Sequence, residues 1–164
     1  MKRSNRFLFR EAIAALKPIA APTIVVGAIR SRGARETDGH STLRWPASAT
    51  IWSVDNDPAA VTITRDLRAD RSNRLCVLAD ALAFLQTFST TIELLYLDGP
   101  HPDHNDGRRW HLDAFQAASL AEHSVLLIDD TDLSKLGKAE LVVPAARDTG
   151  FQLVAGGRQT LMVR

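Results

Sequence analysis

The amino-acid sequence predicts an α/β protein built on a doubly wound, mostly parallel sheet, and three observations support this. Apolar runs rich in Leu, Ile and Val alternate with segments of helical periodicity, as in a sheet that is buried on both faces. Two of these runs, 92–97 and 124–128, end directly in Asp residues. The last residues hold two strand-like runs separated only by the glycines 156–157, which is the signal of an antiparallel hairpin. Five parallel strands and this hairpin give seven strands.

Apolar periodicity and helix signals define the elements of the first half. Apolar residues at helical spacing stop at Pro18, and Gly27 ends the first strand-like run. Asp57 followed by Pro58 marks a helix start, because Asp is a favoured N-cap and Pro suits the first helical position. Asp80 is a second N-cap. The predicted elements are a helix at 5–17, a strand at 23–26, a short helix near 41–45, a strand at 50–54, a helix from 58, a strand at 74–78 and a helix to 88.

The second half continues the alternation and then changes. Pro144 is expected to bend the last helix, and Gly150 to end it as the C′ residue. The predicted elements are a strand at 92–97, a helix at about 108–120, a strand at 124–128, a helix at about 136–148 and the hairpin strands 151–155 and 158–163.

Composition is that of one globular domain over residues 1–164, with 45% hydrophobic and 24% charged residues. The net charge of +1 gives little attraction for nucleic acid, so no such partner is expected. No apolar stretch reaches about 18 residues, and Arg10, Glu11 and Lys17 interrupt the N-terminal hydrophobic residues, so neither a membrane segment nor a signal peptide is expected. The single Cys76 excludes an internal disulfide. A cytoplasmic protein is therefore expected, and a homo-oligomer is compatible with the sequence.

Three carboxylates follow two neighbouring strands, at the sheet edge where ligands of open parallel sheets bind. Asp98 and the pair Asp129 and Asp130 could hold Mg²⁺, which prefers oxygen ligands and keeps several waters. The alternative is that each Asp caps the helix after its strand. Taken together, the three acids favour a site.

Glycine and acid at the ends of the first two strands point to a nucleoside ligand. Gly27 allows a sharp turn and a close approach of the backbone to a ligand, and Gly39 could do the same further along. The alternative is that such a glycine only forms a turn, and for Gly39 taken alone this alternative is favoured. Asp55 lies at the end of the second strand, where a carboxylate can accept hydrogen bonds from both hydroxyls of a ribose. Because Asp57 already explains the helix cap, Asp55 has no evident structural role.

These residues, in this order, resemble the class I S-adenosylmethionine-dependent methyltransferases over nearly the whole chain, from residue 23 to residue 164. The most similar branch includes the small metal-dependent and the macrolide-sugar O-methyltransferases. That family has a seven-stranded Rossmann-like sheet whose final strand inserts antiparallel beside the fifth. The matching segments are Val26-Gly27, Asp38-Gly39-His40-Ser41-Thr42, Val54-Asp55, Ala79-Asp80-Ala81, Leu97-Asp98-Gly99-Pro100-His101 and Ile128-Asp129-Asp130.

The resemblance implies S-adenosylmethionine as cofactor, with Mg²⁺ as a second one if a metal takes part, and a small hydroxylated acceptor methylated on oxygen. Asp98 and His101 would act in catalysis, His101 as a general base or polar ligand. Asp80 would accept from the adenine amino group, or only cap its helix. The implied metal ligands are Asp98, Asp129 and Asp130. The implied cofactor-binding residues are Gly27, Ala28, Gly39, Ser41, Thr42, Asp55, Asn56, Asp80, Ala81 and Asp98.

One position departs from the family, because the residue two before the first-strand glycine is commonly acidic and here is Val25. Glu36 or Asp38 could substitute. A nicotinamide dinucleotide is disfavoured, since no glycine lies two places after Gly27 as its fingerprint requires. Two other functions stay open: a methyltransferase-like protein that binds the nucleoside without turnover, and a nucleotide or sugar-nucleotide enzyme on the same fold.

Trp110 and His111 are neighbours on the helix expected at about 108–120. His111 is expected to be a surface residue. Trp110, like Trp45 and Trp52, either packs in the core or stacks on a ligand.

Overall fold

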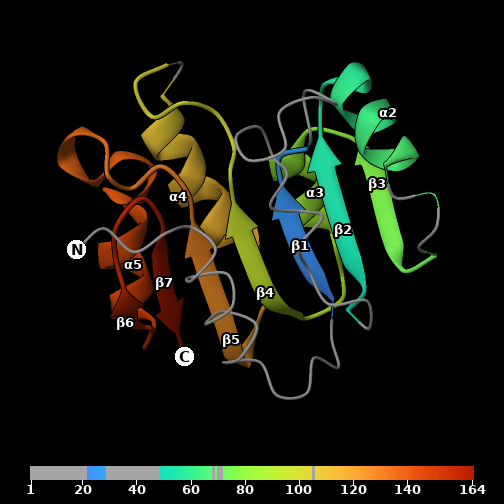
Figure 1. Cartoon of the computed structure of the whole chain (residues 1–164). Helices are drawn as coiled ribbons and strands as arrows, with labels where there is room; N and C mark the ends of the chain where they lie inside the picture. Colours follow the sequence, from blue (N-terminus) through green and yellow to red (C-terminus); the bar gives the residue numbers. More distant parts are fainter. Residues whose placement is uncertain (1–21, 29–48, 68, 70–71, 105) are drawn as a thin grey trace.

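A seven-stranded sheet organises the part of the chain that the computed structural model describes, residues 22–28, 49–67, 69, 72–104 and 106–164 (Figure 1). The strands are β1 (Thr23–Val26), β2 (Ile51–Asp55), β3 (Arg74–Leu78), β4 (Ile92–Leu97), β5 (Leu120–Ile128), β6 (Gln152–Ala155) and β7 (Thr160–Val163). Their order is β3-β2-β1-β4-β5-β7-β6, with β1 to β5 parallel and β7 antiparallel to both β5 and β6. This confirms the predicted fold class. The helices predicted at 5–17 and 41–45 lie outside the described residues.

Helices follow four of the strands, and both predicted N-caps are confirmed. The described helices are α2 (Pro58–Asp66), α3 (Ala81–Thr87), α4 (Gly107–Ala117), the 3₁₀ helix η2 (Ser134–Ala139) and α5 (Val142–Asp148). The Asp57 side chain accepts a hydrogen bond from the N–H of Ala59, and the Asp80 side chain accepts one from Ala83. Each carboxylate thereby satisfies an N–H that the first helical turn leaves unpaired. No described helix has the length and apolarity needed to cross a membrane.

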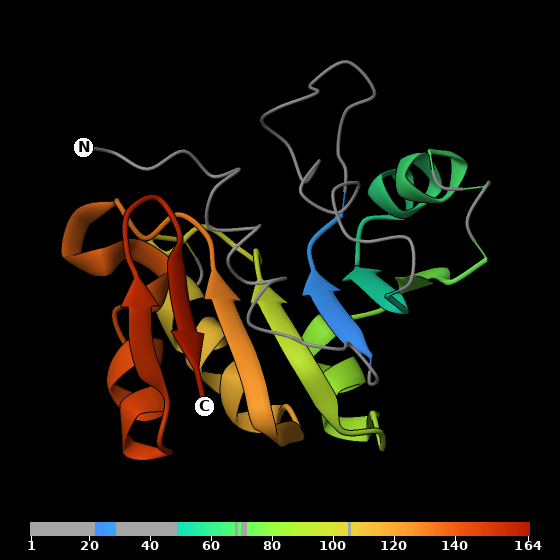
Figure 2. The same cartoon turned by 60° about the horizontal axis from the view of Figure 1, so that its bottom comes forward.

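Both faces of the sheet carry buried side chains. On one face, Ile24 and Leu95 belong to a cluster that includes side chains of α3, α4 and α5, and Figure 2 shows these helices together on that face. On the other face, Val25 and Leu94 belong to a second buried cluster. Because successive strand residues point to opposite faces, this double burial explains the continuous apolar runs of the sequence.

The boundary between α4 and β5 differs from the prediction. Leu120 was expected in the helix but lies in β5, where it pairs with Ile92 of β4. The helix accordingly ends at Ala117, and the strand begins four residues earlier than predicted at 124. Pairing with β4 decides this boundary, and local periodicity does not reveal it.

The helix predicted at 136–148 is split in two. Leu136 and Gly137 have φ angles of 65° and 51°, which are incompatible with a right-handed helix. The regular helix α5 begins only at Val142, so Pro144 lies in its first turn, where proline is tolerated, and does not cause the break. Gly150 has a φ of 94° just after the helix, as expected of a C′ glycine.

The hairpin connection is longer than its two glycines. Strand β6 ends at Ala155 and β7 begins at Thr160, so residues 156–159 form the loop. The carbonyl of Arg158 accepts from the N–H of Thr131, which follows β5. This bond joins the loop to the neighbouring strand end and keeps Arg158 out of the hairpin ladder.

His111 is buried, which corrects the prediction of a surface residue. The side chain is 0% exposed, and its Nδ1–H donates to the carbonyl of Gly107 at 2.6 Å. Burial lowers the pKa of His111 to about 4, although the bond to Gly107 acts in the opposite direction. The imidazole is therefore neutral near pH 7.

This burial predicts a pH-dependent stability. As the pH falls below 6.5 the unfolded chain protonates His111, whereas the folded protein does so only near pH 4, so the free energy of unfolding falls within this window. Between pH 7.5 and pH 5 the loss from this group is about 2 kcal/mol. Urea unfolding at both pH values measures it. In His111→Asn, which keeps a donor for Gly107, the stability difference between the two pH values should be smaller by about that amount; an unchanged difference contradicts the assignment.

Candidate functional site

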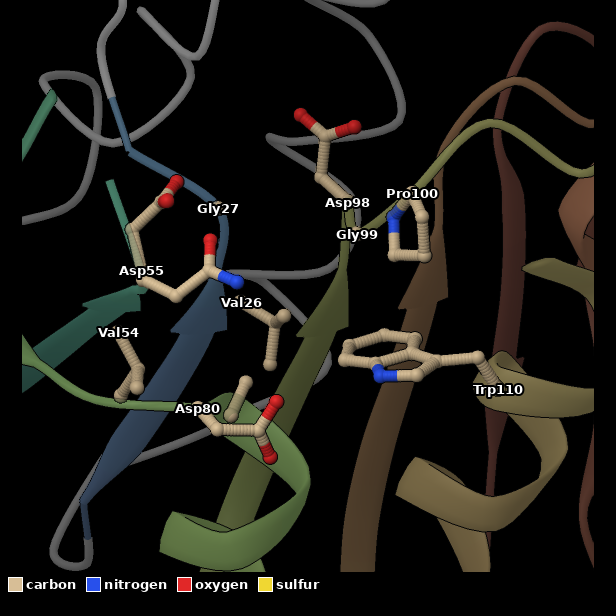
Figure 3. Close-up of a pocket in the computed structure, with 11 residues that line it drawn as sticks. Val26, Gly27, Val54, Asp55, Asp80, Asp98, Gly99, Pro100 and Trp110 are labelled. Carbon is tan, nitrogen blue, oxygen red and sulfur yellow. The ribbon is translucent and has the colours of Figure 1, made fainter. Parts of the chain in front are cut away.

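A pocket lies at the carboxyl ends of β1, β2 and β4 (Figure 3). Strand β1 has β2 on one side and β4 on the other, so the strand order reverses at this point. Open α/β sheets bind their ligands at such a switch point. The lining residues are Val26, Gly27, Val54, Asp55, Asn56, Asp80, Ala81, Asp98, Gly99, Pro100 and Trp110.

Most of the predicted cofactor-binding residues that the structure describes meet in this pocket. Those that line it are Gly27, Asp55, Asn56, Asp80, Ala81 and Asp98. Figure 3 shows Asp55 and Asp98 on either side of Gly27, with Asp80 and the Trp110 ring below them in this view. Ala28 is not part of the lining, but its N–H donates to Asp55. Gly39, Ser41 and Thr42 lie outside the described residues.

Asp55 ties two turns together, which corrects the expectation that it has no structural role. It is 6% exposed, and its Oδ2 and Oδ1 accept hydrogen bonds of 2.9 Å from the N–H groups of Ala28 and Asp57. These bonds join the turn after β1 to the turn that begins α2. A carboxylate oxygen can accept at two positions, so both oxygens keep capacity for a ligand hydroxyl.

Gly27 brings the turn after β1 against β4. Its φ is 106°, and a Cβ added there would lie 2.6 Å from the carbonyl oxygen of Asp98. Only glycine combines this conformation with such a close approach of two backbones. The glycine therefore helps to fix where Asp98 leaves the sheet.

Trp110 is a pocket residue, an assignment that the sequence left open. Its ring packs directly on the backbone of Gly99, where an added Cβ would lie 2.3 Å from Cζ3. Figure 3 shows the ring reaching from α4 toward Val26. Trp52, in contrast, packs against Phe84 and Phe88 in the core. Trp45 lies outside the described residues.

A lysine lies between the carboxylates that were predicted to bind a metal. The Nζ of Lys138 is 2.8 Å from Asp98 Oδ1 and 3.0 Å from Asp130 Oδ2, and this lysine is 3% exposed. Across residues 22–28, 49–67, 69, 72–104 and 106–164, no group of three or more His, Cys, Asp or Glu side chains is placed to hold a metal ion. The arrangement does not support the predicted Mg²⁺ site. No sequence motif marks Lys138, because only the folded chain brings it to these acids.

Asp129 contacts other partners. Its Oδ2 accepts a hydrogen bond of 2.9 Å from the hydroxyl of Tyr96, and that hydroxyl accepts one of 3.1 Å from Nε2 of Gln159. Arg158 donates to Asp130 Oδ1 at 3.0 Å, and its Nε lies 3.9 Å from Asp129 Oδ1. The three predicted metal ligands are thus divided between a lysine, an arginine and a tyrosine.

Burial and charge set the protonation of this cluster. Burial raises the pKa of Asp98 to about 7, with Lys138 opposing the rise and Asp129 adding to it. Burial, and then the charge of Asp130, raises the pKa of Asp129. For Lys138 burial acts to lower the pKa, but Asp98 and Asp130 together outweigh it and raise the pKa. The lysine is therefore a charged ammonium.

His101 is placed away from the pocket lining. Its side chain is 48% exposed, and its Nδ1 accepts from the N–H of Asp103 at 3.3 Å. The structure therefore brings Asp98, but not His101, to the pocket.

Solved structures of known proteins share the fold of this chain. No protein-family model and no curated protein sequence matches the chain. Among solved structures, a methyltransferase from Geobacter sulfurreducens is 19% identical, with a TM-score of 0.60, over 96% of this chain and 75% of that one. Cofactor-bound Rv0187 from MTB is 19% identical, with a TM-score of 0.61, over 99% of this chain and 81% of that one. The chain has a methyltransferase-like fold.

A third similar structure is longer. NSun6 from Pyrococcus horikoshii, determined with SFG, is 17% identical, with a TM-score of 0.65, over 98% of this chain and 51% of that one. This chain therefore spans about half the length of NSun6. At such identities the similarity concerns the fold, and the chemistry has to be argued from the site.

The geometry at Gly27 predicts a damaging substitution. Gly27→Ala should lower the free energy of unfolding by about 2 kcal/mol or more, because alanine is strained at a φ of 106° and its Cβ meets the carbonyl of Asp98. Denaturant unfolding measures the change. Gly156→Ala is the control, since nothing lies within 4 Å of a Cβ added there. Equal stabilities of the two variants would contradict the prediction.

Proposed function

We propose that this protein is an S-adenosylmethionine-dependent methyltransferase that methylates a small hydroxylated acceptor. The observation that carries the proposal is the pocket at the switch point, where Gly27, Asp55, Asp80 and Asp98 converge from three strand ends and the start of a helix. The similarity of the fold to a structure described as a methyltransferase and to one described as cofactor-bound supports it.

The lining offers the polar groups that a nucleoside needs. Asp55 would accept from the ribose hydroxyls with the acceptor positions that Ala28 and Asp57 leave. Asp80 uses Oδ1 to cap α3, so Oδ2 would accept from the adenine amino group. Trp110 supplies an aromatic face beside these carboxylates.

Methyl transfer requires an in-line approach of the acceptor oxygen and removal of its proton. Asp98 lines the pocket and has a pKa raised to about 7, chiefly by burial, so it would accept this proton near neutral pH. The residues do not fit a bound Mg²⁺, and no step of the proposal uses one. Asp98 is therefore the catalytic residue of the proposal, and His101 has no part in it.

Calorimetry with S-adenosylmethionine and S-adenosylhomocysteine tests the cofactor. The wild type should bind both, with and without Mg²⁺, and Asp55→Ala should bind at least about tenfold more weakly because hydrogen bonds to a charged carboxylate are lost. Asp57→Ala is the matched control: it removes a neighbouring carboxylate that caps α2 but lies outside the pocket lining, so it should bind like the wild type.

Three results would contradict parts of the proposal. Absence of binding by the wild type at millimolar ligand removes the cofactor from it. Equal weakening in Asp55→Ala and Asp57→Ala assigns the effect to the helix start and not to the ribose. Tight binding without turnover, in a screen of hydroxylated acceptors, favours instead the nucleoside-binding protein without methyl transfer.

A further inference from the structure

We propose that Lys138 is a built-in cation that takes the position of a divalent metal between the ends of β4 and β5, and so makes this site independent of metal. The proposal concerns Lys138 and the two carboxylates it contacts. It holds whether or not the neighbouring pocket binds S-adenosylmethionine, so its failure and that of the proposed function are separate outcomes.

The distances are those of an ammonium site. Lys138 Nζ lies 2.8 Å from Asp98 Oδ1 and 3.0 Å from Asp130 Oδ2, which are hydrogen-bond lengths between charged groups. Oxygens that bind Mg²⁺ lie at about 2.0–2.1 Å from the ion. The two carboxylates thus converge on one point, and their distances to it are those of an ammonium and not of a metal ion.

The charges also match those of a metal site. Lys138 and Arg158 together bring two positive charges to Asp98, Asp129 and Asp130, which is the charge a divalent ion would bring. The two cations differ in burial, since the Lys138 side chain is 3% exposed and that of Arg158 is 52% exposed. Lys138 is therefore the internal member, and Arg158 closes the cluster from the solvent side.

The backbone before Lys138 is shaped to turn this side chain inward. Lys135 and Leu136 have φ angles of 54° and 65°, and a Cβ added to Gly137 would lie 2.0 Å from the carbonyl oxygen of Asp130. Strained conformations of this kind persist only where the surrounding structure enforces them. Here they fold η2 back onto the end of β5 and bring Lys138 over the two carboxylates.

Contacts with α4 hold the same segment from its other side. Arg108 donates to the carbonyl of Ser134 at 3.4 Å, and its Nε lies 2.6 Å from a carboxylate oxygen of Glu140. Both ends of η2 are thereby fastened to one arginine. His111 of α4 also lies near Lys138. It is neutral near pH 7, so Asp98 and Asp130 are the counter-charges of Lys138.

Titration with Mn²⁺ tests the proposal. Calorimetry measures binding of the ion, and the melting temperature measures its effect on stability. The wild type should bind no Mn²⁺ at this site and show no shift in melting temperature. Lys138→Ala should melt at a lower temperature, gain one Mn²⁺ site per chain and recover stability as Mn²⁺ is added, because a ligand that binds only the folded state stabilises it. Lys135→Ala, which changes an exposed lysine of the same segment, should behave like the wild type.

Further variants connect the gained site to the two carboxylates. Lys138→Ala combined with Asp130→Asn should bind no Mn²⁺, since one of the converging carboxylates is removed. Lys138→Gln keeps most of the side-chain packing without the charge, and it should also gain the Mn²⁺ site. It serves as the test if Lys138→Ala does not fold.

Two outcomes overturn the proposal. One is a wild type that binds one Mn²⁺ per chain in a manner abolished by Asp98→Asn, because the lysine would then not occupy the metal position. The other is a folded Lys138→Gln or Lys138→Ala that neither binds Mn²⁺ nor recovers stability, because the two carboxylates would then not form a cation site.

Discussion

The site depends on a backbone ladder that continues one residue beyond the ends of the parallel strands. The bonds that extend it are Gly27 N–H to Val54 O, Asp98 N–H to Val26 O and Asp129 N–H to Leu97 O. They hold the first residue after each strand in the register of the sheet, so the hydrogen-bonded ladder extends to the pocket edge. At Gly27 the backbones of β1 and β4 meet too closely for a side chain. Functional side chains placed on such rigid ends need little reorganisation to bind a ligand.

Asp residues at the ends of neighbouring strands lie in different environments, because the segments that follow the strands supply different hydrogen-bond partners. Asp98 and Asp129 both follow neighbouring strands, yet Asp98 meets Lys138 and the pocket, and Asp129 meets the hydroxyl of Tyr96. Asp130, in a left-handed conformation with a φ of 48°, provides the second carboxylate for Lys138. The position of an acid at a strand end thus predicts that it is near the site, while its partner decides what it can do.

Sequence reasoning succeeded where the signal is local. Asp57 and Asp80 are N-caps because the chemistry of a helix start involves only the next few residues, and the buried strands β1, β2, β4 and β5 follow from their apolar runs. The sequence-based predictions were wrong or incomplete where a residue's environment depends on a partner that is distant in the sequence. Leu120 joins β5 through its pairing with β4, and burial of His111 depends on the packing of α4. Lys138 follows β5 by ten residues, and nothing in its sequence surroundings marks a contact with Asp98.

A fixed ammonium and a divalent metal lead to different acceptor chemistry. A metal activates a hydroxyl by coordinating it directly, and two neighbouring hydroxyls make good ligands. Lys138 is too deeply buried to touch an acceptor, so its charge acts only through the carboxylates that it contacts. Under the proposed function, activation then occurs by proton transfer to Asp98, which requires a single hydroxyl within hydrogen-bond reach. An acceptor with one isolated hydroxyl is therefore as suitable as one with a neighbouring pair, whereas a metal at this position would favour the pair.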